Sequence, residues 1–102
     1  MDVVREFQRG AMRLHVLHHA AAGEVHGAWL IEELARHGYR VSPGTMYPLL
    51  ARLEAAGLLR SRPEVVEGRQ RRRYRATPQG RKALGACRKA LRELAGEVLA
   101  RP

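Results

Sequence analysis

A short segment between Ser42 and Gly57 constrains the fold more than any other part of this sequence. Ser42 is a preferred N-terminal cap residue, and Pro43 suits the first position of a helix. Gly57 favours the end of a helix. Between them, apolar side chains recur at the spacing of one helix face: Met46, Leu49, Leu50 and Leu53. The segment is therefore predicted to be an amphipathic helix that packs on a core through this stripe.

The outer face of this predicted helix is short of carboxylates and carries Thr45, Tyr47, Pro48, Ala51 and Arg52. Such a face suits contact with DNA. Pro48 lacks the N–H group that would bond Gly44, and an interior proline costs about 3 kcal/mol. Two interpretations follow. The regular helix starts only at Pro48, a distorted first turn shapes the outer surface, or both hold.

Two more helices are expected upstream. The first covers roughly residues 3–22 and is apolar on two faces, so one face is expected to pack on its own domain and the other on a second subunit. The second covers about residues 27–37, with Leu30, Ile31 and Leu34 facing inward and Gly38 as its stop. Trp29 lies off that inner face, so we expect something to cover it.

The segment after Gly57 is expected to form a β-hairpin. Residues 59–66 and 71–76 have the pattern of two strands joined by a Glu-Gly turn. In the second strand, alternate residues point to opposite faces. One face therefore carries Arg71, Arg73 and Arg75, and the other carries Arg72, Tyr74 and Ala76.

Positive charge is concentrated in this hairpin and just beyond it. The chain has a net charge of +9, and nine basic residues meet only two acidic ones, Glu64 and Glu67, between Arg60 and Lys82. No acidic residue is interleaved among residues 69–75. A bias toward arginine and alanine would raise the total charge but would not explain its clustering. The cluster favours a polyanionic partner.

Thr77 and Pro78 mark the start of a last helix. Its apolar residues form a narrow seam, Leu84, Cys87, Leu91, Leu94 and Val98. Such a seam requires a partner helix, either in its own domain or, as we favour, in a second copy. We expect a DNA-binding unit over residues 1–77 and a dimerisation helix over residues 78–102, together in one compact unit. Cys87 is interpreted as a small packing residue, since a single cysteine excludes an intrachain disulfide and a Cys-rich zinc site.

These elements together predict a mainly α fold with a small β-hairpin. Three helices followed by a basic hairpin form a winged helix-turn-helix, here with an added C-terminal dimerisation helix. The third helix is expected to enter the major groove of duplex DNA, and the hairpin to contact phosphates or the minor groove.

Three sequence blocks carry a specific resemblance. HGAWLIEEL (26–34), SPGTMYPLLARLEAAGLL (42–59) and GRQRRRYRATPQG (68–80) are similar to the hallmark blocks of the PadR family of bacterial transcriptional regulators. The resemblance implies a cytoplasmic homodimer held by the last helix with help from the first. It also implies repression relieved by a small molecule or another signal. The short C-terminus resembles the subgroup with a single dimerisation helix.

By position in these blocks, the resemblance implies a recognition face made of Ser42, Pro43, Gly44, Thr45, Tyr47, Pro48 and Arg52. It implies a DNA-contacting wing made of Gly68, Arg69, Gln70 and Arg71, to which the strand pattern adds Arg73. The family often has an aromatic residue directly after the His-Gly pair, whereas this chain has Ala28 and then Trp29. Trp29 is therefore a candidate effector contact.

Other classes of function have weaker support. The sequence has no carboxylate pair at a useful spacing and no phosphate-cradling glycine loop, so we expect no enzyme and no cofactor. A winged helix can instead act as a protein-protein adaptor. RNA binding is less favoured, because RNA readers usually display stacking aromatics. The N-terminus lacks the apolar core of a signal peptide, and no stretch is long enough to cross a membrane, so the cytoplasm is expected.

Histidines provide the main rival site. His15, His18 and His19 lie about one turn apart on the first predicted helix, and His26 and His37 could join them across the fold. A metal-responsive regulator is thus an alternative. We favour packing or surface roles for these histidines and predict no metal site.

Overall fold

The computed structural model describes residues 1–101 of the chain. They form four helices and three strands in the order α1 (Val3–Ala22), β1 (Val25–His26), α2 (Gly27–Arg36), α3 (Pro43–Ala55), β2 (Leu59–Val66), β3 (Arg69–Ala76) and α4 (Pro78–Val98). The mainly α fold with a small β-hairpin is therefore confirmed. The strand β1 was not expected from the sequence.

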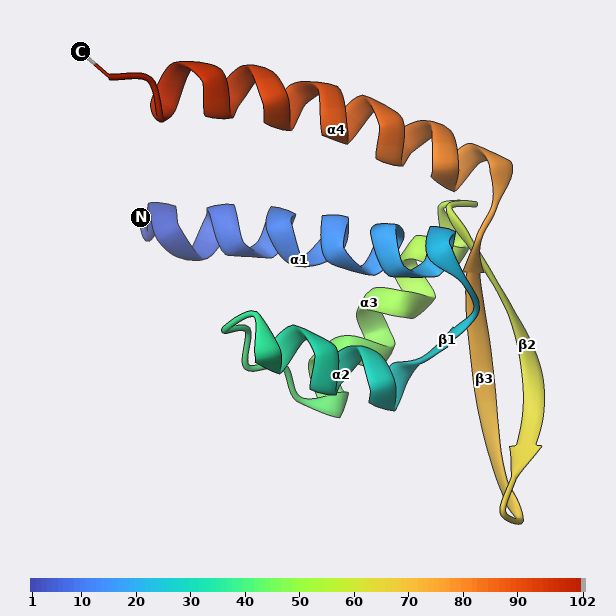
Figure 1. Cartoon of the computed structure of the whole chain (residues 1–102). Coiled ribbons are helices and arrows are strands. Elements are labelled where there is room, and N and C mark those ends of the chain that lie inside the picture. The colour runs from blue at the N-terminus through green and yellow to red at the C-terminus, as the bar shows by residue number, and fades with distance from the viewer. Residues whose placement is uncertain (102) are drawn as a thin grey trace.

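The helices lie in layers beside one end of the sheet (Figure 1). Helix α1 lies between α4 on one side and the α2–α3 pair on the other, and α1 and α4 run antiparallel. The sheet is antiparallel in the order β1-β3-β2, with Val25 paired to Tyr74 and His26 to Arg73. The β2–β3 hairpin extends away from the helices as a wing.

The core forms where α1, α2, α3 and the sheet meet. The stripe predicted for α3 is buried, as are Leu30 and Leu34 of α2. Other elements complete this cluster with Val16, Leu17, Ala20, Leu59, Tyr74, Ala76 and Leu84. Each buried leucine contributes about 1.5–3 kcal/mol relative to an exposed one. No polar or charged residue is buried in residues 1–101, so apolar packing fixes how α3 and the wing are placed.

Helix α3 begins at Pro43, and Pro48 lies inside it. The interpretation that the regular helix starts only at Pro48 is therefore wrong. The N–H groups of Thr45 and Met46 both donate to the carbonyl oxygen of Ser42, at 3.0 and 2.9 Å, and close the first turn. Ser42 occupies the cap position, but its side chain makes no capping hydrogen bond to the backbone. Its hydroxyl donates to Thr45 Oγ1 at 3.4 Å instead.

The wing is a two-residue hairpin. Glu67 and Gly68 have positive φ values of 51° and 77°, which are the conformations that a type I′ turn requires. The second strand begins at Arg69, two residues before the predicted start, so Arg69 and Gln70 lie in the strand. Tyr74 and Ala76 are buried and Arg75 is exposed, which confirms the expected alternation of faces.

The junction between β3 and α4 is tightly packed against the end of α3. Thr77 caps α4, since its hydroxyl accepts from the N–H of Gly80 at 2.9 Å and donates to the carbonyl oxygen of Gly57 at 2.6 Å. The N–H of Thr77 donates to the carbonyl oxygen of Leu58 at 3.1 Å. Gly80 is buried directly against Leu58. These contacts hold the end of β3 and the start of α4 against the end of α3.

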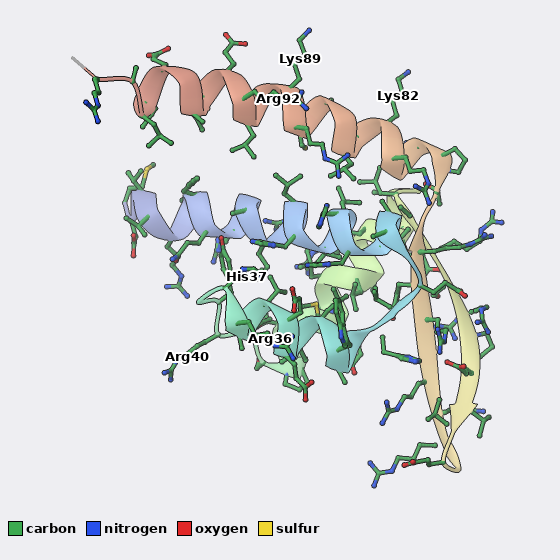
Figure 2. All side chains as sticks on the ribbon, viewed as in Figure 1. Arg36, His37, Arg40, Lys82, Lys89 and Arg92 are labelled. Carbon is green, nitrogen blue, oxygen red and sulfur yellow. The ribbon has the colours of Figure 1, made fainter. Side chains whose placement is uncertain are left out.

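The apolar seam of α4 is largely uncovered within one chain. Leu84 is buried against the core, whereas Leu91, Leu94 and Val98 are 46%, 51% and 67% exposed. Cys87 is also exposed in the single chain, so its interpretation as a packing residue of the seam stays a prediction that requires a second copy. Figure 2 shows Lys82 and Lys89 on the opposite side of α4, pointing away from α1.

The N-terminal half of α1 is similarly uncovered. Val3, Val4 and Phe7 are exposed, and in Figure 1 this end of α1 lies on the same side of the molecule as the C-terminal end of α4. Farther along, Leu14 of α1 faces α4 of the same chain, since it lines a cavity together with Leu84 and Leu91. No helix of residues 1–101 is both long and apolar enough to span a bilayer.

Candidate nucleic-acid interface

The predicted recognition face of α3 is open to solvent. All seven of its residues are exposed: Ser42, Pro43, Gly44, Thr45, Tyr47, Pro48 and Arg52. The opposite face of α3 holds the buried stripe, so the core fixes which side chains point outward. The first turn of α3 contains no acidic residue, so this face presents no charge that would repel a phosphate.

The tip of the wing is exposed and basic. Gly68, Arg69, Gln70 and Arg71 are all exposed, in agreement with a contact role. In the described part of the chain, several arginines of the hairpin form no ion pair: Arg60, Arg69, Arg71, Arg72 and Arg75. No carboxylate of residues 1–101 neutralises these charges, so they can attract an external anion, although Arg72 Nε also donates to Ser61.

A groove of about 540 Å³ separates the wing from the helices. Tyr47 of α3 lines it together with Arg69, Gln70 and Arg71 of β3. The structure thus brings together one predicted recognition residue and three predicted wing residues. Thr45 and Arg52 lie outside the lining of this groove.

The start of α2 forms the third wall of the groove, through His26, Gly27 and Ala28. The backbone N–H groups at the start of a helix favour anions, and His26 provides no side-chain cap to occupy them. These residues were missed as site residues from the sequence. Their position at the N-terminus of a predicted helix, within the HGAWLIEEL block, is the signal that could have identified them.

Tyr47 and Gly27 are in direct contact across this groove. A Cβ atom on residue 27 would lie 2.6 Å from Cε1 of Tyr47, which is too close for van der Waals contact. Gly27 therefore allows the phenol ring to lie against the start of α2. Tyr47 is still 46% exposed as a residue, and it lines the groove.

A hydrogen-bond chain connects α3 to the wing. The N–H of Ser61 and its hydroxyl both donate to the carboxylate of Glu54, each at 2.9 Å. Arg72 Nε in turn donates to the Ser61 hydroxyl at 3.0 Å. Glu54 lies in the last turn of α3 and Ser61 lies in β2. The chain holds the recognition helix and the hairpin in a fixed relative orientation.

Two arginines of the wing are not free. Arg62 donates to both carboxylate oxygens of Glu24, at 2.8 and 3.0 Å, and Arg73 Nε binds Glu64. The hydrogen bond from Arg73 lowers the pKa of Glu64, and the one from Arg62 lowers the pKa of Glu24. Both carboxylates are therefore charged at neutral pH. Although no acidic residue is interleaved among residues 69–75, Arg73, a predicted wing residue, is thus paired with a carboxylate of the neighbouring strand.

Histidines from α1 and the end of α2 meet around Glu33. His19 Nε2 and His37 Nε2 lie 3.5 and 3.2 Å from Glu33 Oε2, and the rings of His15 and His37 stack with centroids 5.0 Å apart. Burial is the main reason that the pKa values of His15 and His19 are lowered. Within residues 1–101, no group of three or more histidine, cysteine or acidic side chains is arranged to hold a metal ion.

Trp29 borders the same cluster. Its ring meets the ring of His19 edge to face, with centroids 5.1 Å apart, yet 41% of the residue is exposed in the single chain. The expected cover for Trp29 is thus only partly supplied by its own chain.

Comparisons with known proteins agree with this architecture. Residues 16–86 match the Transcriptional regulator PadR-like family. The chain is 71% identical over 96 residues to the transcriptional regulator Rv3488 of Mycobacterium tuberculosis, covering 94% of this chain and 90% of that protein.

Solved structures show the same fold. A PadR family transcriptional regulator from Eggerthella lenta is 32% identical, with a TM-score of 0.78, over 97% of this chain and 90% of that one. A PadR-like transcriptional regulator from Bacillus cereus is 26% identical, with a TM-score of 0.82, over 91% of this chain and 92% of that one. The chain belongs to the PadR-like family of transcriptional regulators and has their winged helix-turn-helix fold.

Proposed function

We propose that this regulator acts in the cytoplasm, binds duplex DNA as a homodimer and represses transcription until a small molecule or another signal releases it. One observation carries the DNA-binding part. Tyr47 of α3 and the wing residues Arg69 to Arg71 line one basic groove. A single ligand that spans this groove would contact both elements at once, as duplex DNA does in this architecture.

In the proposed complex, the first turns of α3 enter the major groove. Thr45 and Tyr47 then read base edges or contact neighbouring phosphates through their hydroxyl groups. The other exposed residues of the recognition face help to position the helix. Arg69, Gln70 and Arg71 of the wing contact the backbone or the minor groove, where an arginine contributes affinity that depends little on sequence.

The proposal of a homodimer rests on the exposed apolar seam of α4. Leu91, Leu94 and Val98 line one side of α4, and an exposed apolar stripe of this kind is expected to pair with another helix. We propose that residues 78–102 pair with those of a second copy, with help from the start of α1. Residues 1–77 then form the DNA-binding unit. Trp29 is the proposed contact for an effector.

Selection of bound duplexes from a random library tests the proposal. A homodimer should recover an inverted repeat whose half-sites lie about one helical turn apart. Binding should weaken steeply with salt, with a log–log slope of roughly 5–10 released counterions. Transcription in vitro from a promoter that overlaps the selected duplex should fall when the protein is added. A protein that binds no duplex at low salt would refute the proposal.

A further inference from the structure

Three basic side chains lie in one row across the sheet of the wing. Arg73 of β3 pairs in register with His26 of β1 on one side and with Arg62 of β2 on the other. Residues directly opposite one another on adjacent strands point to the same face, and like charges in that arrangement repel. The row therefore needs anions close by, and Glu24 and Glu64 supply them.

Of these two carboxylates, Glu64 contacts more members of the row. Its Oε2 atom binds Arg73 Nε and also lies 3.2 Å from His26 Nε2, so one carboxylate contacts two members of the row. The side chains of Glu64 and Arg73 are both half-buried, at 25% and 33% exposed, whereas Arg62 in the other pair is 53% exposed. Solvent and salt screen a half-buried pair less than an exposed one. Solvent therefore screens the Arg73–Glu64 pair less than the Arg62–Glu24 pair.

The pair of Glu64 and Arg73 lies close to Arg71, which is proposed to contact DNA. Arg73 lies two residues along β3 from Arg71, and Glu64 is directly opposite Arg71 in the hairpin. A free arginine there would add one more attraction to phosphates, which acts on every DNA sequence alike. An arginine whose charge is already neutralised by a carboxylate adds much less attraction to the phosphates.

We propose that Glu64 sets how much sequence-independent DNA affinity the wing contributes. It holds Arg73 away from the DNA backbone and thereby limits sequence-independent binding, while the contacts of α3 with the bases are unchanged. This inference rests on the proposed DNA-binding function.

The test is Glu64→Gln, which removes the charge and keeps the size. The matched control is Glu67→Gln, because Glu67 lies in the turn of the same hairpin, is exposed and has no ion pair in the described residues. Each protein is titrated, at several salt concentrations, with the duplex recovered by selection and with a shuffled duplex of the same length and composition. Thermal unfolding of each variant shows that the hairpin is still folded.

We expect Glu64→Gln to steepen the salt dependence on both duplexes by about one counterion per subunit. It should tighten binding to the shuffled and the selected duplex by about the same factor, so the ratio of the two affinities stays nearly constant. Glu67→Gln should change both affinities much less, because it releases no arginine. In an Arg73→Ala background, Glu64→Gln should no longer steepen the salt dependence.

Three results would overturn the inference: an unchanged affinity of Glu64→Gln for the shuffled duplex, an equal effect of Glu67→Gln, or an effect that persists without Arg73. An equal effect of Glu67→Gln would mean that the net charge of the protein, and not the release of Arg73, determines the affinity for DNA. These results leave the proposed function intact, provided that the wild-type protein prefers the selected duplex. A wild-type protein that binds neither duplex would refute the proposed function and this inference together.

Discussion

The carbonyl oxygen of Leu58 occupies the space in which residue 80 would carry a Cβ atom. Gly80 lies in the first turn of α4, and Leu58 lies in the turn between α3 and β2. Because the neighbour is backbone rather than a flexible side chain, nothing nearby can move aside cheaply. The close approach lets Thr77 bond both Gly57 and Gly80.

Gly80→Ala should therefore destabilise the protein, although alanine is the better helix former. Overpacking of this kind costs about 1–3 kcal/mol, which exceeds the gain of about 1 kcal/mol from helix propensity. Gly85→Ala is the matched control in the same helix, since a Cβ atom there would meet nothing within 4 Å. Urea denaturation should show a loss of stability for the first variant and a gain for the second. Equal stability of the two variants would contradict the packing argument.

The recognition helix and the wing should differ in what they contribute to DNA binding. Thr45→Ala or Tyr47→Phe should cost about 1–3 kcal/mol on the selected duplex and little on a shuffled one. Arg69→Ala or Arg71→Ala should weaken both and reduce the salt slope by about one unit. Titration with both duplexes at several salt concentrations separates the two patterns. If the wing variants lose specificity and the helix variants lose only general affinity, the two roles are reversed.

Gly27→Ala should disturb the recognition face without touching DNA directly. The added methyl group would lie 2.6 Å from the ring of Tyr47, so the partly exposed ring must move. We expect the preference for the selected duplex to fall, as in a Tyr47 variant, with little change in thermal stability. A Gly27→Ala protein that retains full specificity would show that the position of the ring is unimportant.

Substitutions in the seam of α4 should abolish dimerisation without unfolding the chain. Leu91 and Leu94 are about half exposed in the single chain, so changing both to glutamine should leave the fold intact and abolish the dimer. Sedimentation velocity would show the change in mass, and circular dichroism would report the helix content. Lys89→Gln, on the opposite side of α4 (Figure 2), should leave the mass unchanged. A stable dimer of the double variant would exclude the seam as the dimer contact.

Stability should decrease as the pH falls below about 6.5. Burial lowers the pKa values of His15 and His19 in the folded chain, with contributions from neighbouring histidines. Below pH 6.5 the unfolded chain therefore takes up protons that the folded chain does not, and the free energy of unfolding falls until the folded pKa values are passed. Above pH 6.5, His15 and His19 no longer change the free energy of unfolding. Denaturation between about pH 5 and 8 should show this slope, and a His15→Asn, His19→Asn variant should flatten it.

The sequence predicts the parts of this fold that local spacing determines. The stripe from Met46 to Leu53, the Glu67–Gly68 turn and the Thr77 cap all depend on residues a few positions apart. Strand β1 has only two residues, so it has no alternating pattern to detect, and it exists because it pairs with Tyr74 and Arg73.

The contacts of the candidate interface can likewise be divided into those that a local pattern predicts and those that depend on tertiary packing. The exposed face of α3 can be predicted from the period of its apolar side, and the wing from its charge. The Glu24–Arg62 pair joins residues 38 positions apart, and the contact between Gly27 and Tyr47 depends on how two helices cross. Such pairings arise from tertiary packing, and no local pattern in the sequence indicates them.

Only Thr77 lies between the last residue of β3 and the first residue of α4. If two copies pair through α4, no flexible linker separates the surface that pairs the copies from the wing that meets DNA. The spacer length between two half-sites would then be fixed by the backbone itself, because the wings cannot swing to reach a longer or shorter operator. A regulator built in this way could acquire a new spacer length only by changing how its α4 helices cross.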